Sequence, residues 1–127
     1  SIVEETVKEC KRLKLRKVGL LASTKTIKMK LHIRELEQEN IQVLTPEPKD
    51  QKFISECILR IINHKINLND KVKIIRIIHS LKLKGAEGII LGCTDLPLLI
   101  QRTDVNLPLL NTLTILENAC INSLINI

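Results

Sequence analysis

The stretch Gly85-Ala86-Glu87-Gly88-Ile89-Ile90-Leu91-Gly92-Cys93-Thr94-Asp95-Leu96-Pro97-Leu98-Leu99 decides which fold is expected of this chain. Residues 88–91 form an apolar run that is flanked by glycine and is too short for a helix. Such a run is typical of a strand that is buried on both faces of a parallel sheet. Cys93 comes just after this strand, at its carboxyl end, where open α/β sheets bind their ligands.

A helix is expected to begin directly after Cys93. Thr94 or Asp95 can cap it, and Pro97 falls in its first turn, where the missing N–H costs nothing. The free N–H groups and the positive end of the helix dipole would favour a thiolate and a bound carboxylate at this turn. Cys93 is therefore the first candidate for chemistry, and a buried cysteine in an ordinary turn is the alternative.

Strands alternate with helices along the rest of the chain. Apolar runs and helical stripes predict strands at 18–22, 41–44, 88–91 and 107–110, and helices at 2–14, 27–39, 50–62, 69–84 and from 112 onward. Asp50 and Asn69 are the expected caps of the two central helices. Segment 27–34 alternates apolar and polar residues, which favours a strand. Good helix formers continue to Glu39, and parallel strands need a long crossover, so we predict a helix there.

This order of elements predicts an α/β fold with a single small domain over residues 1–127. The domain is expected to contain a four-stranded parallel sheet with helices on both faces. Cys10 and Cys57 lie on apolar stripes and are expected in the core, whereas His32, His64 and His79 are expected at the surface or its margin. The last helix is expected to place an apolar side on the body of the protein, formed by Ile115, Leu116, Ala119, Cys120, Ser123 and Leu124.

Composition and charge narrow the class of protein further. Hydrophobic residues make up 44% of 127 residues, enough for one core, and the formal charge is +6. The lysines are spread over every segment, and neither Tyr nor Trp is present to stack bases, so we expect no nucleic-acid partner. No apolar run approaches the roughly 18 residues of a membrane span, and no leader precedes the first helix. A soluble cytoplasmic protein with no membrane partner is expected.

The cysteines do not indicate a metal site. The four cysteines lack the C-x-x-C spacing of zinc and redox sites, and the three histidines show no ligand spacing. A chain with this much apolar core does not need disulfides, so free thiols are expected.

Residues 92–99, with the sequence GCTDLPLL, resemble the GCT-[EH]-x-P-L-L signature of the cofactor-independent aspartate/glutamate racemase superfamily. The resemblance is closest to the aspartate branch, which carries an acidic residue after the threonine. Three further segments resemble the family in the same order: 18–27, 43–46 followed by Gln51, and 107–112. Together they correspond to the second half of a racemase.

The resemblance implies a reaction that uses two cysteines, one from each of two similar half-domains, and neither metal nor PLP. One cysteine acts as thiolate base and the other as thiol acid on opposite faces of the α-carbon. Cys93 matches the cysteine of the second half, and Thr94 and Asp95 would contact the substrate. The loop with Thr24 and Thr26 would hold a carboxylate, unless these residues serve only as turn and capping groups.

A lysine that binds the side-chain carboxylate is another feature of the family. Lys65 stands two residues beyond the matching position and is the candidate, with a solvated lysine as the alternative. The chain also departs from the family pattern. Lys25 replaces a glycine, Asn111 an aspartate and Leu116 a histidine, and the first catalytic cysteine, in a C-N-T-x-H-like motif, is missing.

Two hypotheses follow. In the first, the chain is the carboxyl-terminal half of an aspartate/glutamate-type racemase that acts on a small amino acid or dicarboxylate. One thiol cannot serve both faces of a carbanion, so we expect little or no racemase activity unless the missing half, or a second copy in a homodimer, supplies another cysteine. In the second, the chain is a non-catalytic module that binds a small carboxylate or has a structural role.

Overall fold

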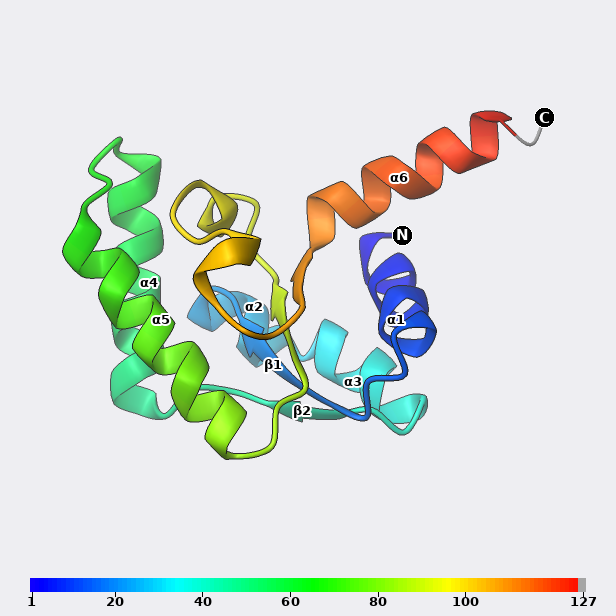
Figure 1. Cartoon of the computed structure of the whole chain (residues 1–127), viewed down its shortest axis with the longest axis horizontal. Coiled ribbons are helices and arrows are strands. Elements are labelled where there is room, and N and C mark those ends of the chain that lie inside the picture. The colour runs from blue at the N-terminus through cyan, green and yellow to red at the C-terminus, as the bar shows by residue number, and fades with distance from the viewer. Residues whose placement is uncertain (126–127) are drawn as a thin grey trace.

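A four-stranded parallel sheet forms the centre of the protein in the computed structural model, which describes residues 1–125 (Figure 1). The strand order is β2-β1-β3-β4, and all three neighbouring pairs are parallel. The strands are β1 (Lys17–Leu21), β2 (Gln42–Leu44), β3 (Gly88–Leu91) and β4 (Leu109–Asn111). The predicted α/β fold with a small parallel sheet is confirmed.

Helices cover both faces of this sheet, as predicted. The helices are α1 (Ile2–Arg12), α2 (Thr24–Met29), α3 (Leu31–Gln38), α4 (Pro48–Ile62), α5 (Leu68–Leu83) and α6 (Thr112–Ile125). Helices α4 and α5 pack as a hairpin on one side, whereas α1, α3 and α6 lie on the other (Figure 1). No helix among residues 1–125 is both long and apolar enough to cross a membrane.

Alternate residues of the central strands supply two separate cores. Leu21 and Ile89 pack with the apolar stripes of α4 and α5, and Leu20 and Ile90 pack with those of α1 and α3. The strand period of two residues places successive side chains on opposite faces, so the buried residues 18–21 of β1 and 88–91 of β3 are all apolar. Cys10 and Cys57 are fully buried, one in each core, which confirms their prediction as core residues.

The segment after β1 is helical, but it contains two helices instead of one. Lys30 has a left-handed backbone (φ 56°) and separates α2 from α3. Helix α2 begins at Thr24, so only Ala22 and Ser23 connect it to β1, whereas the sequence predicted a loop over residues 23–26. The choice of helix over strand was correct, and the early start follows from Ser23, whose hydroxyl caps the helix by accepting from the Thr26 N–H.

The predicted caps of α4 and α5 are displaced by two or three residues. Asn67, not Asn69, caps α5: its side-chain oxygen accepts a 2.8 Å hydrogen bond from the Asp70 N–H. Helix α4 begins at Pro48, which is favoured at a first helical position, so Asp50 lies within the first turn instead of capping it.

His32 is buried, with 8% of its surface exposed, so its prediction as a surface or margin residue is wrong. Helix α3 begins at Leu31, and the four-residue spacing places His32 on the same helix face as the fully buried Leu36. Neither ring nitrogen has a hydrogen-bond partner among residues 1–125. His64 and His79 are exposed, as predicted.

Helix α6 packs on the body of the protein over its first half. Thr112 is its one buried residue among 112–125, Ile115 and Ala119 are half-buried, and Cys120 and Leu124 are exposed. Figure 1 shows α6 passing alongside α1 and continuing beyond it. The predicted apolar side is therefore covered in its first half and open to solvent in its second.

Candidate active site at the carboxyl ends of β1 and β3

The site lies where the chain changes direction across the sheet. From β1 the chain crosses to β2 at one edge, whereas from β3 it crosses to β4 at the other. Leu21 and Leu91, the last residues of the two central strands, stand opposite each other in the register. The segments that follow these two residues thus leave the sheet side by side, at the switch point where open α/β sheets bind ligands.

Gly92 holds these two strand ends close together. Its N–H donates a 2.8 Å hydrogen bond to the Leu21 carbonyl. A Cβ at this position would lie 3.1 Å from the Cβ of Ala22, which is tighter than ordinary packing. The lack of a side chain at Gly92 therefore allows residues 22–26 and 93–95 to start from adjacent points.

Cys93 is half-buried, with its side chain packed against the core beneath α4 and α5. Its thiol donates a long hydrogen bond, 3.9 Å from Sγ to Oδ2, to the carboxylate of Asp95. Thr94 is exposed between them. The thiol thus lies at the boundary between core and solvent, with one acidic group in contact.

The helix that was predicted directly after Cys93 does not form. A three-residue 3-10 turn, η1 (Leu96–Leu98), follows, and the Asp95 side chain does not cap it. Leu96, Leu99 and Ile100 are buried, so their packing holds this segment against the core and the chain then extends at Gln101. So short a turn has only a small dipole, and the predicted stabilisation of a thiolate by a helix end is not available here.

The two candidate threonines of the first segment have different partners. The Ser23 hydroxyl accepts from the Thr26 N–H at 3.2 Å and donates to the Thr26 hydroxyl at 3.0 Å. Thr26 therefore takes part in the cap of α2, which is one of the two roles that the sequence allowed for it. Thr24 instead faces α4. Its N–H donates to the Ser55 hydroxyl at 3.2 Å, and the two hydroxyl oxygens are 2.7 Å apart.

Gln51 joins this group from the first turn of α4. Its side-chain amide donates to the Ala22 carbonyl at 2.9 Å and lies 3.4 Å from the hydroxyls of both Thr24 and Ser55. Gln51 and Ser55 are one helical turn apart, so both reach the end of β1 from the same face of α4.

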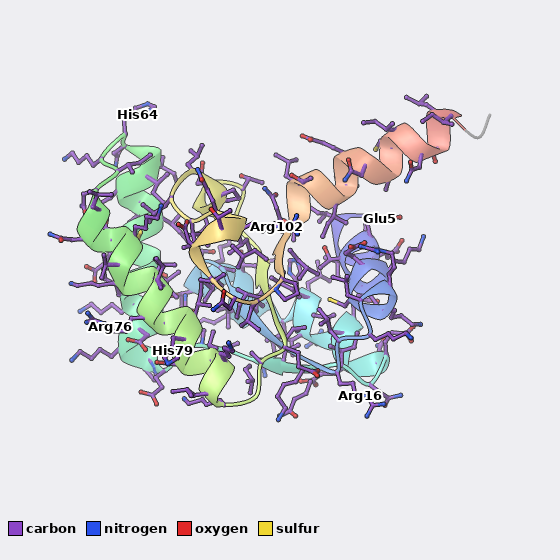
Figure 2. All side chains as sticks on the ribbon, viewed as in Figure 1. Glu5, Arg16, His64, Arg76, His79 and Arg102 are labelled. Atoms are coloured by element: carbon purple, nitrogen blue, oxygen red, sulfur yellow. The ribbon has the colours of Figure 1, made fainter. Side chains whose placement is uncertain are left out.

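Lys65 lies away from this group. It is exposed in the connection between α4 and α5, and Figure 2 shows the preceding residue, His64, at the tip of that hairpin. Within residues 1–125 no hydrogen bond or ion pair links Lys65 to Thr24 or Cys93. The structure therefore places Thr24, Thr26, Cys93, Thr94 and Asp95 at one edge of the sheet and Lys65 outside that cluster.

Sequence reasoning missed three supporting residues. Gln51 and Ser55 hold Thr24, and the buried hydroxyl of Thr112 donates a 3.1 Å hydrogen bond to the Leu91 carbonyl. Gln51 and Thr112 belong to segments that resemble the family, and that was a usable signal. Ser55 carried none, apart from its four-residue spacing from Gln51.

The model of the Asp/Glu/Hydantoin racemase family matches residues 1–120. The chain belongs to this family. A crystal structure of a proposed Asp/Glu racemase from Yersinia pestis superposes on this racemase-family chain with a TM-score of 0.84 and 28% identity, over 90% of this chain and 50% of that one. An aspartate racemase homologue from Pyrococcus horikoshii OT3 gives a TM-score of 0.80 and 29% identity, over 94% and 55%.

Two further proteins are similar to this chain, one in fold and one in sequence. The aspartate racemase of Picrophilus torridus has the same fold, with a TM-score of 0.75 at 19% identity over 94% of this chain and 52% of that one. An uncharacterized protein in the pnlA 3' region of Pectobacterium carotovorum subsp. carotovorum is 35% identical over 106 residues, which are 80% of this chain and 67% of that protein. This racemase-family chain thus spans about half the length of the solved structures it matches.

Proposed function

We propose that this chain supplies one half of the active site of an aspartate-type amino-acid racemase, with Cys93 as an acid/base thiol. The observation that carries the proposal is the position of Cys93: half-buried, at the switch point of the sheet, next to the segment with Thr24. Family membership supports the reaction class, and the solved relatives named for aspartate support the substrate class.

In the proposed reaction the Cys93 thiolate removes the α-proton from one face of the substrate. The C–H bond breaks, the S–H bond forms, and the electron pair stays on the α-carbon next to the substrate carboxylate. A second group returns a proton to the opposite face, which inverts the centre. The hydroxyls of Thr24 and Thr94 suit the substrate carboxylates, and the carboxylate of Asp95 suits the substrate ammonium group.

The two-cysteine reaction needs a second thiol from outside this edge of the sheet, because Cys93 is the only thiol there in residues 1–125. The other half of a racemase fold, or a second copy of this chain, fits that need. We therefore place the complete site between Cys93 and a cysteine of a partner half. Lys65 stays a candidate for such a composite site, since it is exposed and free to meet a partner.

All four cysteines are free, two of them fully buried, and this supports a cytoplasmic protein because disulfides are rare in that compartment.

The test is exchange of the aspartate α-proton in D2O, followed by proton NMR, with chiral chromatography of the same samples. Exchange that depends on Cys93 and is lost in Cys93→Ser is the expected result. Inversion should rise more steeply than linearly with chain concentration if two copies form the site. Cys120→Ser is the matched control, since Cys120 is exposed on α6, away from the site. Exchange that is equal in Cys93→Ser and the parent protein would contradict the proposal.

A second function, binding of a small carboxylate without catalysis, is favoured by the presence of a single thiol at this edge of the sheet among residues 1–125. Alkylation separates the two. A catalytic thiol reacts quickly with iodoacetamide near pH 7.5 and is protected by aspartate, whereas in a binding module Cys93 reacts no faster than Cys120.

A further inference from the structure

The contacts around Thr24 fix what its hydroxyl can do. We propose that Gln51 and Ser55 together make the Thr24 hydroxyl a dedicated hydrogen-bond donor, and that it selects a carboxylate of the ligand; the ligand class rests on the function proposed above. The assignment follows from counting donors and acceptors in the group formed by Ala22, Thr24, Gln51 and Ser55.

The orientation of the Gln51 amide follows from its contact with Ala22. Its nitrogen lies 2.9 Å from the Ala22 carbonyl oxygen, and the reversed amide would bring two acceptor oxygens together. The Gln51 nitrogen therefore faces Ala22, and its side-chain oxygen Oε1 is buried with no partner among residues 1–125. Its second hydrogen is directed to the hydroxyls of Thr24 and Ser55, both 3.4 Å from the nitrogen.

The Ser55 hydroxyl has both of its acceptor positions occupied. Its oxygen accepts from the Thr24 N–H at 3.2 Å and from the Gln51 amide at 3.4 Å, which uses both of its lone pairs. The contact of 2.7 Å between the hydroxyls of Ser55 and Thr24 then needs Ser55 as donor.

The Thr24 hydroxyl keeps a free donor and no free acceptor. It accepts from Ser55 and from Gln51, and only its own proton is left without a partner in residues 1–125. Its backbone N–H is already bound by Ser55. Thr24 can therefore offer a ligand one donor and no acceptor. A carboxylate satisfies that donor, whereas an ammonium group does not.

Gln51 and Ser55 are thus positioning residues, because they act through Thr24 and reach it from the core side of the α4 helix. The half-buried location of Thr24, beside the strand end that leads to Cys93, gives this donor a place in the same site.

The experiment titrates the whole chain with succinate, and with succinamide as its uncharged analogue, by ¹H–¹⁵N NMR. The parent protein should bind succinate and not succinamide. Thr24→Val should weaken succinate binding about tenfold, the effect of one hydrogen bond to a charged group, and Thr24→Ser should retain it. Ser55→Ala should weaken binding and speed exchange of the Thr24 amide, whereas Ser55→Thr should restore both. Thr103→Val, at an exposed position, is the control.

Unchanged succinate affinity in Thr24→Val, or no succinate binding by the parent protein, would overturn the inference. If Thr24→Val does not fold, the comparison of Ser55→Ala with Ser55→Thr decides instead. Cys93→Ser separates this inference from the proposed function: succinate should still bind to that variant. Succinate binding that depends on Thr24, with no Cys93-dependent proton exchange, would leave the inference standing and remove the racemase proposal.

Discussion

The hydroxyl of Thr112 donates a 3.1 Å hydrogen bond to the carbonyl of Leu91, and so ties the start of α6 to the last residue of β3. Thr112 is 2% exposed. Asn111, directly before it, caps α6 by accepting from the N–H groups of Leu113 and Thr114. The end of the strand that leads to Cys93 is therefore fixed from the β4 side by one side chain, and from the β1 side by the Gly92 N–H.

Replacement of Thr112 by valine should lower the free energy of unfolding by about 1–3 kcal/mol. Valine keeps the shape of the side chain and removes the donor, so the Leu91 carbonyl loses a buried partner. Thr112→Ser should recover most of the loss. Urea denaturation measures both, and the exposed Thr114→Val is the control. Equal stability of Thr112→Val and the parent protein would show that this bond contributes nothing.

Two of the four thiols should react with Ellman's reagent in the folded protein at pH 8. Burial raises the pKa of the Cys10 and Cys57 thiols to about 11, so both stay protonated and shielded. Cys120 is exposed and Cys93 is half-buried, and these two should react. Cys120→Ser should leave one reactive thiol, and urea should expose all that remain. A third fast thiol in the folded parent protein would contradict the packing of the two cores.

Removal of the Arg60–Asp70 ion pair should destabilise the α4–α5 hairpin. The guanidinium of Arg60 binds both carboxylate oxygens of Asp70, at 2.8 and 2.9 Å, and the Asp70 side chain is only 8% exposed. Arg60→Leu should cost about 2–3 kcal/mol, less than for a fully buried pair, since a third of the Arg60 side chain meets water. Thermal unfolding measures the loss.

The exposed pair of Lys84 with Glu47 is the matched control for Arg60, because Glu47 directly precedes α4 and Lys84 directly follows α5, at the other end of the hairpin. Lys84→Ala should cost less than about 1 kcal/mol. Equal losses for the two variants would mean that burial of Asp70 does not strengthen its pair.

Stability should fall as the pH is lowered from 7 to 5, partly because of His32. Burial lowers the pKa of the His32 imidazole below its ordinary value of 6.5, so the unfolded chain takes up a proton in this range before the folded one does. The unfolded state then binds more protons, and stability rises with pH. His32→Leu should show a smaller fall in urea denaturation over the same range, while His64 and His79 are retained in both proteins. Parallel pH profiles would contradict the burial of a neutral His32.

The sequence was sufficient for the sheet because each central strand is an apolar run with a glycine next to it or within it. It was also sufficient for α3, since crossover length and helix propensity outweigh the alternation in residues 27–34. It was misleading after Cys93, where capping residues and Pro97 indicated a helix. The burial of Leu96, Leu99 and Ile100 determines the conformation there, and burial depends on tertiary packing.

The candidate site was also predictable only in part. The order of the strands brings the segments after β1 and β3 together, and the glycine before Cys93 marks the close approach. The partners of Thr24 were not predictable, because they come from α4, about thirty residues away, through a geometry that only the folded chain defines. His32 was misjudged because the left-handed Lys30 divides the predicted helix in two, and the orientation of the second helix, α3, decides which face His32 occupies.

Helix α6 is anchored at one end only, and this sets a gradient of local stability along it. Its first turn is fixed by Asn111 and Thr112, whereas Ile121, Leu124 and Ile125 are 52%, 70% and 73% exposed. An isolated helix of this length is marginal in water. Amide exchange along α6 should thus quicken from Ile115 toward Ile125, with fraying that begins at the far end and stops where α1 gives support.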